Sequence, residues 1–312
     1  MAIDYTTDAL VDSVKRRITV PTSQQFFYPA NIVNFANDEM MSTMIPSIIS
    51  VREEYFVTKK DYAISSGVTT YEIPTRAVGG MMRDVVLVDN SGNEVAIPRL
   101  QPETTKSESM LSNTRLYGFI LRDDKVILYP NSDAFTNQSY VRIYYMRRPN
   151  NLVIKSLGAQ ISNVNTGTNE VTLSNVPTSW TTNTTFDVIQ GNPIFSAVAD
   201  DQAITTIAGN ILTFVSLPTG IAAGQWVAEV RNTPIPQIPY EGHHVLAQYT
   251  AARMLEAMGD KANAKVILEI ANNLLEGFLK IITPRTEATM KKINNRAGVF
   301  AYTGQGYFDL RA

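Results

Sequence analysis

The spacing of apolar residues changes twice along this chain, and that change limits the possible folds more than any other feature. Near both ends apolar residues recur every three or four positions, as in amphipathic helices, whereas the middle alternates apolar and polar residues as strands do. Since helices and strands pack in separate layers, both ends are predicted to meet in one helical bundle. We therefore expect an α+β fold: a helical bundle formed by the N- and C-terminal segments, with antiparallel β-sheet and a small inserted β-sandwich or barrel.

Residues 1–54 are predicted to supply the N-terminal helices of the bundle. A first helix is expected in "TTDALVDSVKRRITVP", whose apolar residues share one helical face. A second begins near Pro29, which suits a first helical turn, and Pro46 is expected to break or bend it because proline lacks a backbone N–H. The apolar stripe of this second helix consists of Val33, Ala36, Met40 and Met44.

Residues 55–154 are expected to form an antiparallel β region, because short runs of period two are separated by Gly, Asn and Ser turns. The clearest hairpin is "LYGFILRDDKVILYP", in which two aliphatic strands flank two adjacent aspartates. In "SYVRIYYMRRP" the alternation directs Val141, Ile143 and Tyr145 inward. This pattern is typical of a sheet with one face exposed.

Residues 155–232 are expected to form a small β domain inserted before the last helices. Here Thr, Asn and Gly separate short β-branched runs, and charged residues become rare. Strands at intervals of about ten residues favour a small sandwich or barrel. The segment "NTPIPQIPY" then supplies three prolines as a stiff return from sheet to helix.

Residues 233–298 are expected to complete the bundle as a C-terminal helical hairpin, and residues 299–312 to form a C-terminal arm. The pair Gly259-Asp260 is predicted to end one helix and cap the next. The apolar stripe predicted for the second of these helices consists of Ile267, Ile270, Leu274, Phe278 and Ile281.

Composition excludes several classes of function. The chain of 312 residues has no cysteine, so disulfides, thiolate metal sites and cysteine nucleophiles are excluded. A net charge of −2 gives no bulk positive field for a nucleic-acid coat or a polybasic membrane binder. The N-terminus lacks the basic and apolar regions of a signal peptide, and no run approaches the roughly 18 apolar residues of a membrane span. We expect a protein made in a cytoplasm and without membrane contact.

Few residues carry the chemistry that an enzyme needs. His243 and His244 are the only histidines, and neighbours on a helix point about 100° apart, so both rings cannot bind one metal ion. They are expected to be surface or interface groups. Asp200-Asp201 is expected to be a solvated acidic turn, because neighbours in sequence rarely converge as a catalytic pair. We expect no catalytic residue, no cofactor and no metal site.

A small basic segment follows the last predicted helix. Between residues 280 and 296 five basic residues stand against the single acid Glu287, a local balance of +4. Clustered Lys and Arg attract phosphate without reading sequence, so contact with double-stranded DNA fits this charge. A solvated extension of the helix is the plainer alternative. The five residues are Lys280, Arg285, Lys291, Lys292 and Arg296.

The order of these features resembles a known set of virion proteins. The pieces that carry the resemblance are "DALVDSVKRRITVPTSQQFF", "YEIPTRAVGGMMRDV", "LYGFILRDDKVILYP", and "LAQYTAARMLEAMGD" followed by "TPRTEATMKKINNRAG". They are similar to the head-to-tail connector, or adaptor, ring proteins of short-tailed bacteriophages, and among these to the crAss-like group, whose tails contain stacked ring proteins. The resemblance covers the helical ends and the first β segment and is weak from Lys155 to Val230.

The resemblance implies a non-enzymatic virion protein of the head-to-tail interface, one subunit of a dodecameric ring that lies under the portal and extends the DNA channel. The implied partners are further copies of the chain, the portal protein, further tail or ring proteins, and packaged double-stranded DNA through non-specific contact. The five basic residues then become candidates for a channel-facing or portal-facing surface. Candidates for a subunit-interface arm, with folding back on the chain's own bundle as the alternative, are Phe300, Tyr302, Tyr307 and Phe308.

Two other functions stay open. The Thr- and Asn-rich β region would suit a tail-fibre or receptor-binding adhesin, which predicts a trimer, although fibres usually carry long β repeats and this chain has none. A glycan hydrolase would require two separated carboxylates in a concave site.

Overall fold

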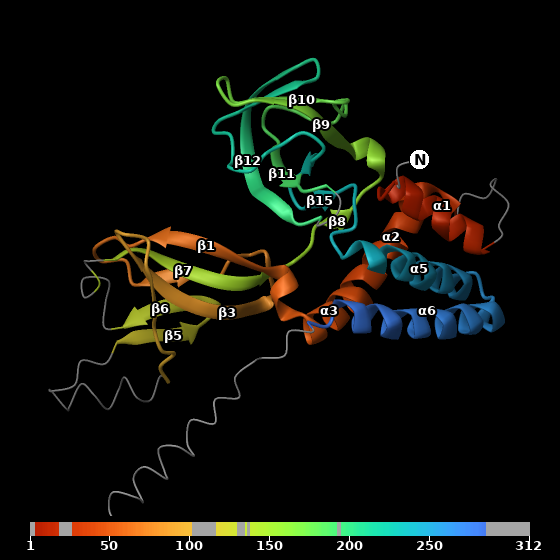
Figure 1. Ribbon diagram of the computed structural model, residues 1–312, viewed down its shortest axis with the longest axis horizontal. Helices are drawn as coiled ribbons and strands as arrows, with labels where there is room; N and C mark the ends of the chain where they lie inside the picture. The colour runs from red at the N-terminus through yellow and green to blue at the C-terminus, as the bar shows by residue number, and fades with distance from the viewer. Residues whose placement is uncertain are drawn as a thin grey trace, which may run out of the picture.

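The computed structural model describes residues 4–18, 27–101, 117–129, 135, 138–191 and 195–284. Figure 1 shows three parts: a group of helices, a region of β-sheet and a small barrel. Helices, antiparallel sheets and a closed barrel in one chain confirm the predicted α+β class.

The N-terminal helices follow the predicted pattern, with one difference at the proline. Helices α1 (Thr7–Ile18) and α2 (Pro29–Glu39) are followed by a π-helical turn (Met40–Met44) and α3 (Ile45–Val51). The chain therefore remains helical through Pro46. Proline cannot donate a hydrogen bond to the preceding turn, and the wider π turn accommodates this without ending the helix.

The C-terminal hairpin consists of α5 (His243–Ala257) and α6 (Lys261–Ile282). Gly259 adopts a φ of +86°, a left-handed conformation that favours glycine and ends α5. The side chain of Asp260 then accepts a hydrogen bond from the N–H of Asn263 at 3.2 Å, which caps α6. The predicted turn and cap are confirmed.

Helices from the two ends of the sequence share one hydrophobic core. Helix α5 contacts α1, α2 and α6, and in Figure 1 it lies between α1 and α6. The side chains that meet there include Val14, Ile32, Met40, Val245, Leu246, Met254 and Phe278.

Helix α6 packs on the core with part of the predicted face, because Phe278 is buried and Ile267 and Leu274 pack against the core. Ile270 and Ile281 were expected in the core, yet their side chains are 46% and 62% exposed. Apolar residues occur on several sides of this helix, so periodicity alone does not decide which side faces the core. Small residues allow α6 to approach its neighbours closely. The residues that are buried are Ala264, Ala271, Phe278 and Ile282.

Two antiparallel sheets pack against each other in the β region. Their shared core contains Val85 and Ile143 from one sheet and Val126 and Leu128 from the other. The first sheet has the order β1 (Val57–Ala63), β7 (Gln138–Arg147), β3 (Ala77–Asp89), β4 (Glu94–Ala96). The second has the order β2 (Thr70–Glu72), β6 (Lys125–Tyr129), β5 (Gly118–Arg122).

The predicted features of this β region are confirmed. Strands β5 and β6 form a hairpin whose turn residues, Asp123 and Asp124, have φ values of +50° and +57°. Positive φ at both central positions matches the right-handed twist of the strands. Along β7, Val141, Ile143 and Tyr145 are buried as expected.

A six-stranded closed barrel follows, which settles the choice between sandwich and barrel. Its core includes Phe186, Phe214 and Val227. The strands are β9 (Gly158–Asn165), β10 (Glu170–Leu173), β11 (Thr185–Ile189), β12 (Ala197–Ala208), β13 (Ile211–Phe214) and β14 (Trp226–Glu229), closed in the order β10-β13-β12-β11-β14-β9.

The chain enters and leaves the barrel side by side. Strand β8 (Asn151–Leu152), just before the barrel, pairs in parallel with β15 (Asn232–Thr233), just after it. The proline-rich return from 233 to 239 is buried throughout, so it runs inside the molecule. Single 3-10 turns complete the described elements at Glu53–Phe56, Lys155–Leu157 and Tyr240–Gly242.

The inward face of α6 can be tested by two truncations. Phe278→Ala is expected to lower the free energy of unfolding by about 3–5 kcal/mol, because it leaves a cavity in the shared core. Ile281→Ala, on the exposed face, should change it by less than about 0.5 kcal/mol. Urea unfolding followed by helical circular dichroism measures both. Equal effects of the two substitutions would show that α6 packs differently.

Candidate functional site

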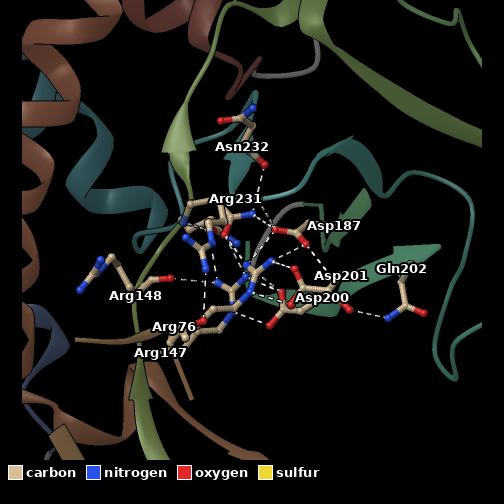
Figure 2. A network of polar contacts seen from close by, with 12 residues as sticks. Arg76, Arg147, Arg148, Asp187, Asp200, Asp201, Gln202, Arg231 and Asn232 are labelled. Carbon is tan, nitrogen blue, oxygen red and sulfur yellow. Dashed lines mark hydrogen bonds and ion pairs between the residues drawn. The ribbon is translucent and has the colours of Figure 1, made fainter. Parts of the chain in front are cut away.

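A network of arginines and aspartates lies where the first sheet meets the barrel (Figure 2). We call it the junction network and define it by five residues. Two arginines come from the β region, one just before β3 and one at the end of β7, and three aspartates come from barrel strands β11 and β12. The members are Arg76, Arg147, Asp187, Asp200 and Asp201.

Asp187 is the centre of this network, and its side chain is fully buried. Its Oδ1 accepts hydrogen bonds from Nη2 of Arg76 at 2.8 Å and from the N–H of Asp201 at 2.9 Å. Its Oδ2 accepts from Nη1 of Arg76 at 2.9 Å. The same oxygen accepts from Nδ2 of Asn150 at 2.7 Å and the N–H of Arg231 at 2.8 Å. Five donors thus satisfy one buried carboxylate.

Each arginine also forms a two-pronged pair with an aspartate of β12. Arg76 donates to both carboxylate oxygens of Asp201, at 2.7 and 3.2 Å. Arg147 donates to both carboxylate oxygens of Asp200, at 2.9 and 2.6 Å. Oδ1 of Asn150 accepts from both guanidinium groups, at 3.2 and 3.0 Å. The planar fork of arginine gives these contacts a defined geometry.

The electrostatics of the site favour the charged forms of Asp201 and Arg76. Hydrogen bonds from Arg76, more than the opposing effect of burial, lower the pKa of Asp201. Burial alone would lower the pKa of Arg76, but hydrogen bonds to Asp201 and Asp187 raise it above its usual value. The lowered pKa makes Asp201 a poor proton acceptor at neutral pH. The arrangement is therefore suited to holding the barrel on the sheet.

The interpretation of Asp200-Asp201 as a solvated turn was wrong. In a regular strand two adjacent side chains point to opposite faces. Here Asp201 has a φ of +55°, and the pairing of β11 with β12 is irregular at this place. A bulge of this kind redirects side chains, so both carboxylates reach the arginines. Their partners lie far away in sequence, and periodicity carries no signal for them.

The candidate basic surface is described at one position only. Lys280 is exposed near the end of α6. The remaining predicted basic and aromatic residues lie outside the described residues: Arg285, Lys291, Lys292, Arg296, Phe300, Tyr302, Tyr307 and Phe308.

The two histidines differ in environment. The ring of His243 is half-buried, with its centroid 5.0 Å from that of Phe195 and 5.7 Å from that of Tyr5. Burial lowers the pKa of His243 to about 4, although its Nε2 lies 3.2 Å from the carbonyl oxygen of Ile238. His244 is exposed. Only His244 therefore matches the expected surface position.

Within the described ranges, no three His, Asp or Glu side chains are placed to hold a metal ion. Among the helices of those same ranges, none is long and apolar enough to cross a membrane. Comparison with protein-family models found no match, and comparison with curated proteins found none either.

Because Asp187 is buried at the centre of the junction network, a conservative substitution there is predicted to lower the stability of the fold strongly. Asp187→Asn is expected to lower the free energy of unfolding by about 3–5 kcal/mol, because an NH2 group replaces one carboxylate oxygen and leaves the buried donors that face it without an acceptor. Asp61→Asn is the matched control. Asp61 also pairs through both oxygens with an arginine, at 2.7 Å each, but on the exposed sheet face, where about 1 kcal/mol or less is expected. Equal losses in urea unfolding would contradict this account.

The lowered pKa of His243 predicts that the fold becomes less stable in acid. Because its pKa falls from 6.5 to about 4 on folding, the unfolded chain binds the proton more tightly, and stability falls as pH drops from 6.5 to 4. The loss should be roughly 2 kcal/mol, since solvent reaches part of the ring. His243→Gln should remove most of this dependence, and the adjacent His244→Gln should retain it. Thermal midpoints measured across that pH range provide the test.

Proposed function

We propose that this chain is a structural subunit of a homomeric ring, dodecameric as the resemblance implies, which joins the capsid portal to the tail of a bacteriophage. In this proposal the protein has no catalytic activity. Its partners are copies of itself, the portal and further tail or ring proteins, and it resides in the virion at the head-to-tail interface. The N- and C-terminal helices together act as the bundle that carries the ring contacts.

The outward face of α6 carries this proposal. Val266, Ile270 and Ile281 are 56%, 46% and 62% exposed. With Asn273 and Gly277 they follow a spacing of three or four residues, so they form one uncharged stripe along the helix. We call these five residues the α6 stripe. Exposed apolar surface of this kind favours contact with another protein.

A second copy of the chain is the occupant that the proposal assigns to the α6 stripe. A ring closes when each subunit presents two different complementary surfaces, one on either side. The stripe runs along a helix of 22 residues, about 33 Å long, which suits one side of such a contact. Lys280, the first residue of the basic segment, lies in the last turn of α6, so a ring would repeat the charge of that segment around its axis.

The junction network supports the same reading, because a ring subunit must hold its parts in one arrangement. The saturated contacts between sheet and barrel favour a rigid subunit over a pair of loosely tethered domains. Every acid in the network is paired with an arginine, which gives no support to a hydrolase centred there.

Mass photometry tests the proposal. The full chain alone, and then mixed with the portal protein of the same virion, is expected to form a large closed species or a complex with one copy per portal subunit. Val266→Asp on the α6 stripe should reduce that species at least about tenfold, because a charge in an apolar contact is left without a partner.

Val215→Asp is the matched control for this test. Val215 is 62% exposed on the barrel, and Val266 is 56% exposed on α6, so the two substitutions add the same charge at similar exposure. Assembly lost in both variants would exclude the α6 stripe as the contact. A stable trimer would favour the adhesin function, and a monomer that does not bind the portal protein would contradict the ring proposal.

A further inference from the structure

A cavity of about 240 Å³ lies beside the junction network, at the point where three parts of the chain meet. The start of β1, the end of β7 and the segment that leads into β12 form its walls. Exposed Ser196 lies at its rim, so the cavity opens to solvent. Apolar side chains form most of the lining: Phe56, Val57, Pro149, Phe195 and Ala197.

Gln237 is one of the residues that line this cavity, and its side chain has an unused hydrogen-bond donor. Its side chain is 3% exposed, and its Oε1 accepts the backbone N–H of Asn150 at 2.6 Å. That bond determines the orientation of the amide, because a flipped amide would place the Nε2 donor against the N–H of Asn150, which is also a donor. The other amide atom, Nε2, is buried and has no hydrogen-bond partner among the described residues. A buried donor of this kind favours an acceptor that comes from outside the chain.

Arg147 brings a second donor. Its Nε and Nη2 are engaged by Asp200 at 2.9 and 2.6 Å. Among the described residues, its Nη1 has only long contacts, both 3.5 Å, to the carbonyl oxygen of Arg148 and to Oε1 of Gln237. This nitrogen therefore has capacity for a shorter bond to an acceptor within the cavity.

Among the described residues, Arg147 is the one charged residue in the lining of the cavity. Its Nε and Nη2 are paired with Asp200, which is not one of the lining residues. Asp200 and Asp201 instead line a separate cleft between β1 and the barrel. A ligand with an anionic oxygen end and a short apolar body matches this combination of donors, charge and apolar walls.

We propose that this cavity is a binding site for a small carboxylate, whose oxygens accept hydrogen bonds from Gln237 Nε2 and Arg147 Nη1 while its apolar part lies against Phe56 and Phe195. The carboxylate can be a free molecule or an acidic group of a neighbouring chain. The site does not depend on the ring proposal, because every residue that forms it belongs to one copy.

Acetate is the probe for this site, and the side-chain amide signal of Gln237 in nitrogen-15 NMR spectra of the full chain is the readout. Acetate is expected to shift that signal in a saturable manner, with a dissociation constant on the order of millimolar for so small a ligand. Acetamide, which has the same shape without the charge, should bind at least about threefold more weakly. The proposal is overturned if acetate gives no saturable shift, or if acetamide binds equally well.

Gln237→Glu provides the second test, followed by thermal stabilisation with acetate. The new oxygen replaces the Nε2 donor, while the other oxygen still accepts the N–H of Asn150, so acetate binding should fall at least about tenfold. Gln160→Glu adds the same charge at an exposed position outside the cavity and should bind acetate as the parent does. Unchanged binding by the Gln237 variant would contradict the assignment. If that variant does not fold, the amide signal of Gln237 in the parent protein still tests whether acetate binds in the cavity.

The same variant distinguishes a free carboxylate from an acidic group of a neighbouring chain. If a neighbouring chain supplies it, Gln237→Glu weakens assembly in mass photometry together with acetate binding. If it is a free molecule, assembly is unchanged and only acetate binding is lost.

Discussion

The buried contact between Asp187 and Arg76 is the interaction on which the arrangement of the β parts depends. Removing carboxylates and guanidiniums from water is costly, and the cost is offset only where nearly every oxygen and N–H finds a partner. Asp187 meets that condition with five donors, among them the backbone N–H groups of Asp201 and Arg231. The folding of the barrel brings these backbone donors to Asp187, whereas Arg76 and Asn150 reach it from the β region only when the barrel is seated on the sheet. The network therefore couples the fold of the barrel to its position on the sheet.

The same region connects the barrel to the helices. The side chain of Asn37 in α2 donates to the carbonyl oxygen of Leu152 at 2.9 Å and accepts its N–H at 2.6 Å, which ties α2 to β8. At the start of α1, the N–H of Thr7 donates to the carbonyl oxygen of Pro234 at 2.9 Å, directly after β15. Helices, sheet and barrel thus meet around the paired strands β8 and β15.

Periodicity predicted the local features of this fold well and its long-range contacts poorly. The hairpin at Asp123-Asp124 and the α5–α6 turn at Gly259 were predictable because short-range backbone geometry determines them. The inward face of α6 was predicted only in part: Phe278 is buried as expected, whereas Ile270 and Ile281 are exposed. The apolar pattern did not indicate that the small residues Ala264 and Ala271 are buried. The junction network was not predictable either, because Arg76 and Asp201 are 125 residues apart and a local irregularity in β12 brings them together.

The most direct test of the central claim, that the junction network holds barrel and sheet as one body, is a distance measurement between them. The chain has no cysteine, so Val95→Cys on β4 and Val215→Cys on the barrel would carry the only two spin labels. Double electron–electron resonance on this doubly labelled protein is predicted to give one narrow distance distribution. A broad or two-peaked distribution would show that the barrel moves relative to the sheet and would contradict the account.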